Sequence, residues 1–192
     1  MERFFGRQKD REYQEAARNL ADGKPEAAIR QLREILEEKP KHVNAMVSLA
    51  VALIQVQEKP KKEAPETVEA LKLLDKAAEM KPKDPVPLFN KGVCYRDLGL
   101  HEQSLEYFEA ALKLEKKQPL ALVHMAEVNV ELERWEEAIR LARLALIQDP
   151  GLEEALAWVP AVMVKAGYLD EEGNIIHTPW EDEDPGADWT RV

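Results

Sequence analysis

Residues 85–118, PVPLFNKGVCYRDLGLHEQSLEYFEAALKLEKKQ, decide the fold of this chain because their pattern returns along the rest of it. A small residue recurs at Ala28, Ala70, Ser104 and Ala138. Proline recurs in the same register at Pro40, Pro82 and Pro150. The step between units is 34 residues, apart from a first step of 42 between Ala28 and Ala70. An internal repeat of this period, with two helical segments per unit, predicts stacked helix pairs.

The pattern resembles the tetratricopeptide repeat over about residues 8–167. Within residues 85–118, seven residues stand where that family has Trp, Gly, Tyr, Gly, Ala, an aromatic residue and Ala: Leu88, Gly92, Tyr95, Gly99, Ser104, Phe108 and Ala111. The fourth unit keeps the small residues, but the polar Asn129 replaces the aromatic. In the first unit Glu12 and Glu15 stand where the family has Trp and Leu. Such a departure suits a terminal unit with one face toward water.

The resemblance implies an all-α fold, a right-handed α-solenoid of about four helix pairs followed by a capping helix and an acidic tail. We expect a repeat domain over 1–167, with units at about 9–42, 43–84, 85–118 and 119–152, a capping helix over 152–166 and a tail over 168–192. Eight extra residues, 58–65, hold two prolines and three lysines, which predicts a solvated loop with Pro65 opening the next helix. Pro160 lies inside the capping helix. Because an interior proline removes a helical hydrogen bond, we predict a bend between Leu156 and Pro160.

Composition restricts the class of partner. The chain has 192 residues and a net charge of −10, and residues 168–192 hold eight acidic residues against one arginine. Nucleic acid is therefore a poor partner, since phosphate contacts need a basic stripe. No apolar stretch reaches the length of a membrane span, so we expect no membrane insertion. The start shows no secretion signal, and a cytoplasmic protein is expected.

Motifs for catalysis or metal binding are missing from the sequence. The four histidines, His42, His101, His124 and His177, are scattered without the spacing of metal ligands. No glycine-rich phosphate loop and no nucleophile turn occur. The single cysteine, Cys94, is read as a small core residue. We therefore expect no catalytic residue, no metal and no cofactor.

The first helix of each pair lines a concave groove in this family, so the resemblance implies which residues face it. Most are apolar, and they are Tyr13, Val47, Val51, Val86, Phe89, Asn90, Val93, Leu120, Val123, His124, Glu127, Trp158 and Ala161. Some relatives clamp the carboxyl terminus of a chaperone there, but only Asn90 matches that clamp. An apolar groove with a polar rim favours an amphipathic helix or an extended apolar segment. The alternative is that several of these valines are buried between helices and the groove is shallower.

Together these features predict a non-catalytic protein-interaction module, an adaptor, assembly factor or co-chaperone that binds an apolar peptide or helix of another protein in its groove. Two alternatives remain open: a scaffold that associates with copies of itself, and a binding module inhibited by its own tail. Candidate tail anchors are Ile175, Ile176, Trp180 and Trp189. Residues 168–176 are also a candidate short hairpin with Gly173-Asn174 in its turn.

Overall fold

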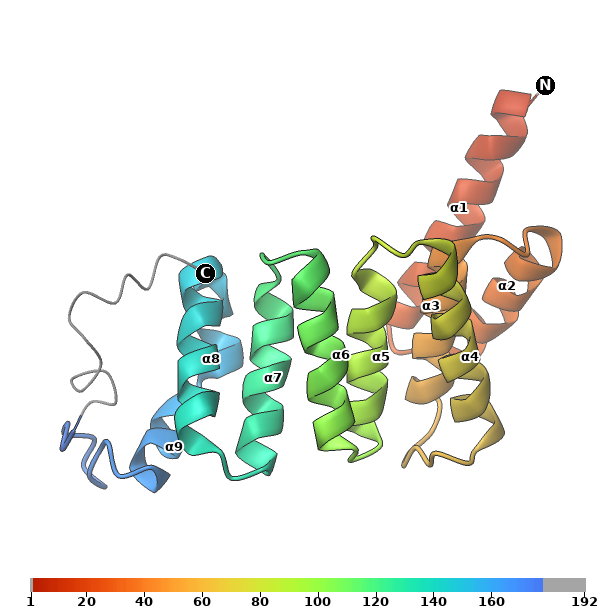
Figure 1. The fold of residues 1–192 in the computed structure, drawn as a ribbon. Helices are drawn as coiled ribbons and strands as arrows, with labels where there is room; N and C mark the ends of the chain where they lie inside the picture. The colour runs from red at the N-terminus through yellow and green to blue at the C-terminus, as the bar shows by residue number, and fades with distance from the viewer. Residues whose placement is uncertain (1, 178–192) are drawn as a thin grey trace. The chain divides into compact units, whose positions relative to one another are not determined.

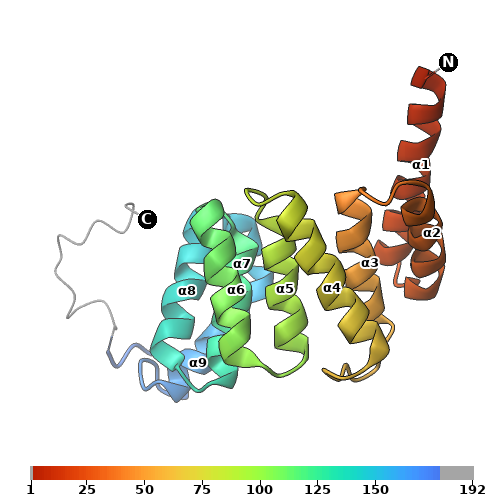
Figure 2. The ribbon, with the colours of Figure 1, turned by 45° about the vertical axis from the view of Figure 1, so that its right-hand side comes forward.

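The computed structural model describes the backbone of residues 2–177 and the side chains of residues 11–177. The chain divides into two compact units after Leu100. The first unit contains α1 (Glu2–Ala21), α2 (Pro25–Glu38), α3 (Val43–Gln55), α4 (Pro65–Met80) and α5 (Val86–Asp97). The second contains α6 (His101–Leu114), α7 (Pro119–Glu131), α8 (Trp135–Gln148), the short 3₁₀ turns η1 (Pro150–Leu152) and η2 (Glu154–Leu156), and α9 (Val159–Lys165). Within the units α3 lies beside α4, and α7 beside α8 (Figures 1 and 2).

Small residues mark the closest helix approaches in the first unit. Ala28 of α2, Ala50 of α3 and Ala70 of α4 are all fully buried. Larger side chains fill the remaining space, and the fully buried ones are Leu32, Met46, Leu49, Leu53 and Leu74. Each such side chain contributes about 1.5 to 3 kcal/mol by leaving water. The small-residue series found in the sequence therefore corresponds to the packing contacts of the helix pairs.

Local signals set the helix starts in this unit. Pro25 and Pro65 each occupy the first turn of their helices, where a missing N–H group costs nothing. His42 precedes α3, and its Nδ1 accepts a hydrogen bond of 3.1 Å from the backbone N–H of Ala45.

The extra residues before α4 form the predicted loop, and a side-chain contact fixes its beginning. α3 ends at Gln55 and α4 starts at Pro65, and the three lysines between them are exposed. Gln57 donates from Nε2 to the carbonyl oxygen of Leu53 at 2.8 Å, and its amide is 3.2 Å from Oγ1 of Thr67. Thr67 is fully buried, so Gln57 supplies the hydrogen bond that its hydroxyl needs there.

In the second unit the polar replacement in α7 is accommodated by the helix itself. Asn129 is buried, and its Nδ2 donates to the carbonyl oxygen of Met125 at 2.8 Å. The turn before α8 has the left-handed residue Glu133, with φ of 57°. The equivalent position two helices earlier is Gly99, with φ of 70°.

The capping segment expected over 152–166, with a bend before Pro160, is interrupted. The chain forms η1 and η2 and then restarts as α9 at Val159, with Pro160 in its first turn. The physical reason is the one anticipated for the bend: proline lacks the N–H group needed inside a helix but fits a first turn. The break lies between Leu156 and Pro160, as predicted.

The first residues of the expected tail, 168–177, close the second unit instead of leaving it. Tyr168 is buried against Ile139 of α8 and Val162 of α9. A single antiparallel bridge joins Leu169 and Ile175, and the backbone N–H of Ile176 donates to the carbonyl oxygen of Tyr168 at 2.9 Å. The candidate hairpin is thus reduced to one bridge around a tight turn.

Two of the expected tail anchors lie in this segment, and both side chains are mostly exposed. Ile175 is 70% exposed and Ile176 is 64% exposed. Trp180 and Trp189 lie outside the described residues. Of the helices in residues 2–177, none combines the length and the apolarity needed to cross a bilayer.

Candidate functional site

The first unit has a pocket of about 360 Å³ on the face formed by the first helices of its pairs. Residues of α1, of α3 and of the start of α5 line it: Tyr13, Leu20, Val43, Asn44, Val47, Ser48, Val51, Asp84, Val86 and Asn90. The structure therefore brings together Tyr13, Val47, Val51, Val86 and Asn90 from the residues expected to face the groove.

The apolar part of the pocket consists of valines at different depths. Val43 and Val47 are each 7% exposed and form its floor. Val51 is half-buried, and Val86 is 48% exposed at the edge. An exposed valine beside a buried apolar floor leaves room for an apolar side chain of a second molecule.

Tyr13 is held in place from two sides. Its hydroxyl lies 3.1 Å from Oγ of Ser48 on α3. Its ring contacts the imidazole of His42, with 5.1 Å between the ring centroids. Because His42 also caps α3, one residue fixes both the helix start and the aromatic wall of the pocket.

The opposite rim is polar and belongs to the start of α5. Asp84 accepts a hydrogen bond of 3.1 Å from the backbone N–H of Val86, and Lys81 lies 3.6 Å from the same carboxylate. Asn90 donates from Nδ2 to the carbonyl oxygen of Val86 at 2.8 Å. Polar groups fixed in this way orient a bound segment, while the apolar floor supplies contact area.

Some of the lining residues were missed by the sequence reasoning. Asn44, Ser48 and Val51 follow one another at helical spacing on α3, so all three occupy one face. That spacing places Asn44 and Ser48 beside Val51, although the expected set did not include them. Leu20 and Asp84 carry no comparable sequence signal.

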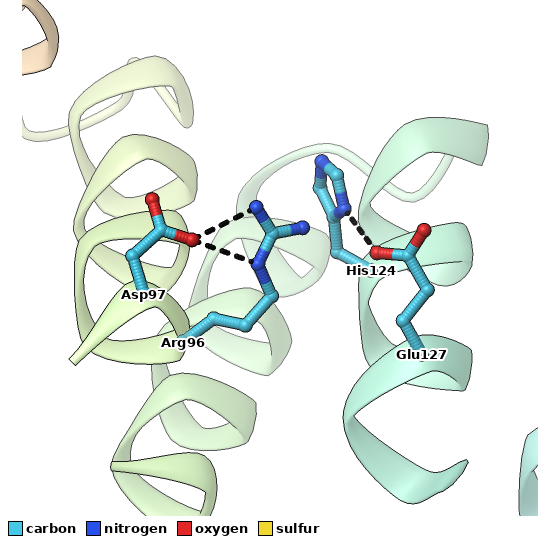
Figure 3. Close-up of polar contacts among 4 residues, drawn as sticks. All are labelled: Arg96, Asp97, His124 and Glu127. Carbon is cyan, nitrogen blue, oxygen red and sulfur yellow. Dashed lines mark hydrogen bonds and ion pairs between the residues drawn. The ribbon is translucent and has the colours of Figure 1, made fainter. Parts of the chain in front are cut away.

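The remaining α5 residues of the expected set, Phe89 and Val93, are half-buried. Farther along this helix Arg96 donates from Nε and Nη2 to Oδ1 of Asp97, at 3.1 and 3.0 Å (Figure 3). Both side chains are partly open to solvent, and an ion pair of this kind contributes little to stability.

In the second unit the expected residues divide between the surface and the core. Leu120 is 53% exposed on α7, whereas Val123 is only 3% exposed, so little of the Val123 side chain is accessible to a guest. The Nδ1 atom of His124 lies 3.0 Å from Oε2 of Glu127 (Figure 3). The His124 ring also stacks on Phe108 of α6, with 5.7 Å between centroids.

Trp158, the last of the predicted aromatics, belongs to a cluster that closes the second unit. It packs with Val162, Ile139 and Tyr168, and its indole Nε1 is buried without a hydrogen-bond partner among the described residues. Ala161 is exposed on α9. Burial raises the pKa of Tyr168 above its usual range, and the neighbouring carboxylate of Glu136, its hydrogen-bond partner, raises it further.

Reactive chemistry finds little support among the described side chains. Burial raises the pKa of the Cys94 thiol to about 11, and the nearby Asp97 carboxylate adds to the rise. A thiol protonated at neutral pH is a poor nucleophile. Within residues 11–177 no group of histidine, cysteine and carboxylate side chains is arranged to hold a metal ion.

Comparisons with known proteins agree with the helix-pair architecture. A tetratricopeptide repeat model matches residues 13–85, and the model of subunit 3 of the anaphase-promoting complex, or cyclosome, matches residues 66–143. No curated protein matches the sequence.

Solved structures resemble the chain in fold. TTC0263, a thermophilic tetratricopeptide repeat protein of Thermus thermophilus, is 20% identical, with a TM-score of 0.71 and 81% of each chain covered. MamA of Desulfovibrio magneticus RS-1, from residue 41 onward, is 19% identical, with a TM-score of 0.63, and the match covers 83% of this chain and 86% of that one. These likenesses confirm the all-α class built from helix pairs. The chain belongs to the tetratricopeptide repeat family, whose fold serves as a module for binding other proteins.

Proposed function

We propose that this protein is a non-catalytic adaptor or assembly factor that binds an apolar peptide or amphipathic helix of another protein. The binding site is the pocket on α1, α3 and α5 of the first unit. The observation that carries the proposal is the combination of an apolar floor with a fixed polar rim in one open pocket of about 360 Å³. Pockets of this construction bind a few apolar side chains and orient them through hydrogen bonds.

The size of the pocket indicates what it can accept. Its volume holds two or three aliphatic side chains, such as the anchors that an amphipathic helix presents at i, i+3 or i+4. The rim offers the hydroxyls of Tyr13 and Ser48 and the amides of Asn44 and Asn90. These neutral groups suit the backbone and uncharged side chains of a guest.

The proposal is tested by selecting displayed peptides that bind the full chain and measuring their affinity for pocket variants. Val51→Asp combined with Val86→Asp places two charges against the apolar floor, and we expect affinity to fall at least tenfold, which is about 1.4 kcal/mol. Both side chains are partly exposed, so the fold should be retained, and far-UV circular dichroism checks it.

Ile147→Asp is the matched control, since Ile147 is 52% exposed on α8 and lies outside the pocket. It should bind selected peptides as the unmodified chain does. Full affinity in the double variant would remove the pocket assignment. Light scattering over a concentration series tests the scaffold alternative. If the molecular mass rises with concentration for the unmodified chain but not for the double variant, the pocket binds a second copy of the chain.

A further inference from the structure

The outer side of α4 in the first unit carries a pocket of about 470 Å³, separate from the pocket just described. Its lining follows one stripe of the helix: Pro65, Val68, Glu69, Lys72, Leu73 and Lys76. The opposite side of α4 is buried through Thr67, Ala70, Leu74 and Ala77. The stripe is thus the part of α4 that the described residues of the first unit leave open.

The apolar side chains of this α4 stripe lie near its middle and at its start. Val68 is 38% exposed, and Leu73 is half-buried. Pro65 is exposed in the first turn of the helix. Apolar side chains that face an open pocket favour contact with a second molecule, because covering them removes apolar surface from water. The stripe therefore offers a small apolar contact, and the charges around it decide what can cover it.

The charges on this side of α4 change sign along the helix. Glu66 and Glu69 come first, and Lys72 and Lys76 follow. Glu79 then lies in the last turn. Because two lysines stand against three carboxylates, the face does not select a partner by its net charge. The order of the charges, acidic and then basic, is what a partner must match.

Local ion pairs neutralise part of this side of α4 but leave the order of its charges intact. Asp75 pairs with Lys91 of α5 at 2.5 Å, and Glu69 pairs with Arg33 of α2 at 2.8 Å. The remaining charged side chains form no ion pair with a described residue, and they are Glu66, Lys72, Lys76 and Glu79. These groups are available to a second molecule.

A helix with this order of charges is complementary to itself in an antiparallel pair. We propose that two copies of the chain associate through their α4 stripes, antiparallel about a two-fold axis at the level of Leu71. Glu66 and Lys76 are each five residues from Leu71, a rise of about 7.5 Å. Glu66 of one copy therefore comes level with Lys76 of the second copy. Glu69 comes level with Lys72 of the second copy to within one residue.

The same axis brings the apolar side chains together. Val68 and Leu73 are three and two residues from it, so those of both copies meet in the middle of the contact. At each end Glu79 of one copy approaches the loop that precedes α4 of the other, where Lys61 and Lys62 are exposed. A parallel pair would instead set like charges level with each other, which is unfavourable. A two-fold contact of this kind uses one patch twice and closes at two copies.

This dimer contact goes beyond the proposed function and does not depend on it. The α4 stripe shares no lining residue with the pocket on α1, α3 and α5, so each assignment holds or fails without the other. One helix face from each copy makes a small contact. We therefore expect weak association, which is detected at high protein concentration and weakens as salt is raised.

Paired charge reversals in the full chain test the contact. The first variant carries Glu66→Lys with Glu69→Lys, and the second carries Lys72→Glu with Lys76→Glu. Alone, each variant sets like charges against each other in the dimer, and we expect its dissociation constant in sedimentation equilibrium to rise at least tenfold. In an equal mixture every facing pair is again of opposite sign, so we expect association at least as tight as that of the unmodified chain. Far-UV circular dichroism checks the fold, since Glu69→Lys also removes the exposed pair with Arg33.

Three controls separate the α4 stripe from general effects of charge. Both reversed variants keep a negative net charge, so their mixture gains nothing from overall attraction. Lys113→Glu with Lys117→Glu makes the same change in net charge as the second variant, at exposed positions of the second unit, and it should dimerise as the unmodified chain does. Its mixture with the first variant should associate more weakly than the mixture of the two reversed variants. Val68→Ser should weaken association with all charges intact, whereas Leu114→Ser, at a similarly exposed position, should not.

Three results would overturn the proposal: an unmodified chain that stays monomeric at high concentration and low salt, a single reversed variant that dimerises as the unmodified chain does, or a mixture of the two that stays monomeric. Val51→Asp with Val86→Asp should leave the dimer intact while it loses affinity for selected peptides. Loss of the dimer in that variant would also overturn the α4 assignment, because it would move the self-association to the pocket on α1, α3 and α5.

Discussion

The first-helix faces of the two units begin from one sequence frame and end in different structures. In the first unit α1, α3 and the start of α5 surround an open pocket with an apolar floor. In the second unit the last first helix is reduced to α9, and Trp158 packs into a closing cluster with Tyr168. The frame position held by Ala50 in α3, Gly92 in α5 and Ala126 in α7 is occupied by Pro160 in α9. The uninterrupted α3 leaves a face for a partner, whereas the interrupted last first helix packs into the cluster that closes the second unit.

The largest expected effect is on the cluster around Tyr168 that closes the second unit. Tyr168→Ala removes a buried aromatic side chain, and we expect a loss of about 3 kcal/mol in the free energy of unfolding. Urea unfolding followed by tryptophan fluorescence measures it, since Trp135 and Trp158 both lie in the second unit. Ile175→Ala, at a position 70% exposed, is the control and should change stability by less than about 0.5 kcal/mol. Similar values for the two variants would mean that residues 168–177 do not close the unit.

The next effect compares the turns between paired helices. Glu133 has φ of 57° where Gly99 has 70° at the equivalent position. A side chain in this left-handed conformation is strained, so Glu133→Gly should raise the free energy of unfolding by about 0.5 to 1 kcal/mol.

The reverse change, Gly99→Ala, should lower stability by about 1 kcal/mol through strain alone, because no atom lies within 4 Å of the added Cβ. Urea midpoints measure both changes. A destabilised Glu133→Gly variant would show that the glutamate side chain contributes more than its conformation costs.

How much the sequence could predict follows from the same two regions. The small residues and the prolines predicted the helix pairs, because close approach and helix starts are local requirements. Pro160 predicted a break, but not that two 3₁₀ turns would precede α9, since that depends on how the segment packs. Depth was not predicted: Val47 and Val123 hold the same repeat position and are both buried, at 7% and 3% exposed, and Val47 lines the pocket of the first unit. Periodicity assigns a residue to a face and cannot say how deep the neighbouring side chains leave it.

A smaller effect is expected from the hydrogen bond between Tyr13 and Ser48 in the pocket of the first unit. Tyr13→Phe removes the hydroxyl bonded to Ser48 and keeps the ring contact with His42. We expect the free energy of unfolding to fall by about 0.5 to 1 kcal/mol, which is typical of one partly buried hydrogen bond. A double-mutant cycle with Ser48→Ala isolates the pair, and the coupling should account for most of that loss. A coupling near zero would mean that Tyr13 is held by its ring alone.

The smallest effect concerns the turn that follows Tyr168, and it depends on pH. The side chain of Asn174 and the backbone N–H groups of Asn174 and Glu172 donate hydrogen bonds to the Asp170 carboxylate, at 2.8, 2.7 and 3.0 Å. These bonds lower the pKa of Asp170 below its ordinary value. Because the pKa is lower in the folded turn, the carboxylate stabilises the turn above its unfolded pKa of about 4, and this stabilisation is lost as pH falls through the folded value.

The amide signals of Glu172 and Asn174 in NMR spectra should therefore titrate at a pH below that of an ordinary aspartate. Asp170→Ala should abolish this titration, and Glu171→Gln, a neighbouring exposed change, should preserve it. Titration at or above the ordinary value would contradict the assigned hydrogen bonds. If the turn opens in acid while Tyr168→Ala still lowers the free energy of unfolding by about 3 kcal/mol, the buried ring closes the second unit without the turn. If the turn opens and the effect of Tyr168→Ala on stability disappears at the same pH, the turn holds Tyr168 in place. Closure of the second unit then depends on Asp170 as much as on the break at Pro160.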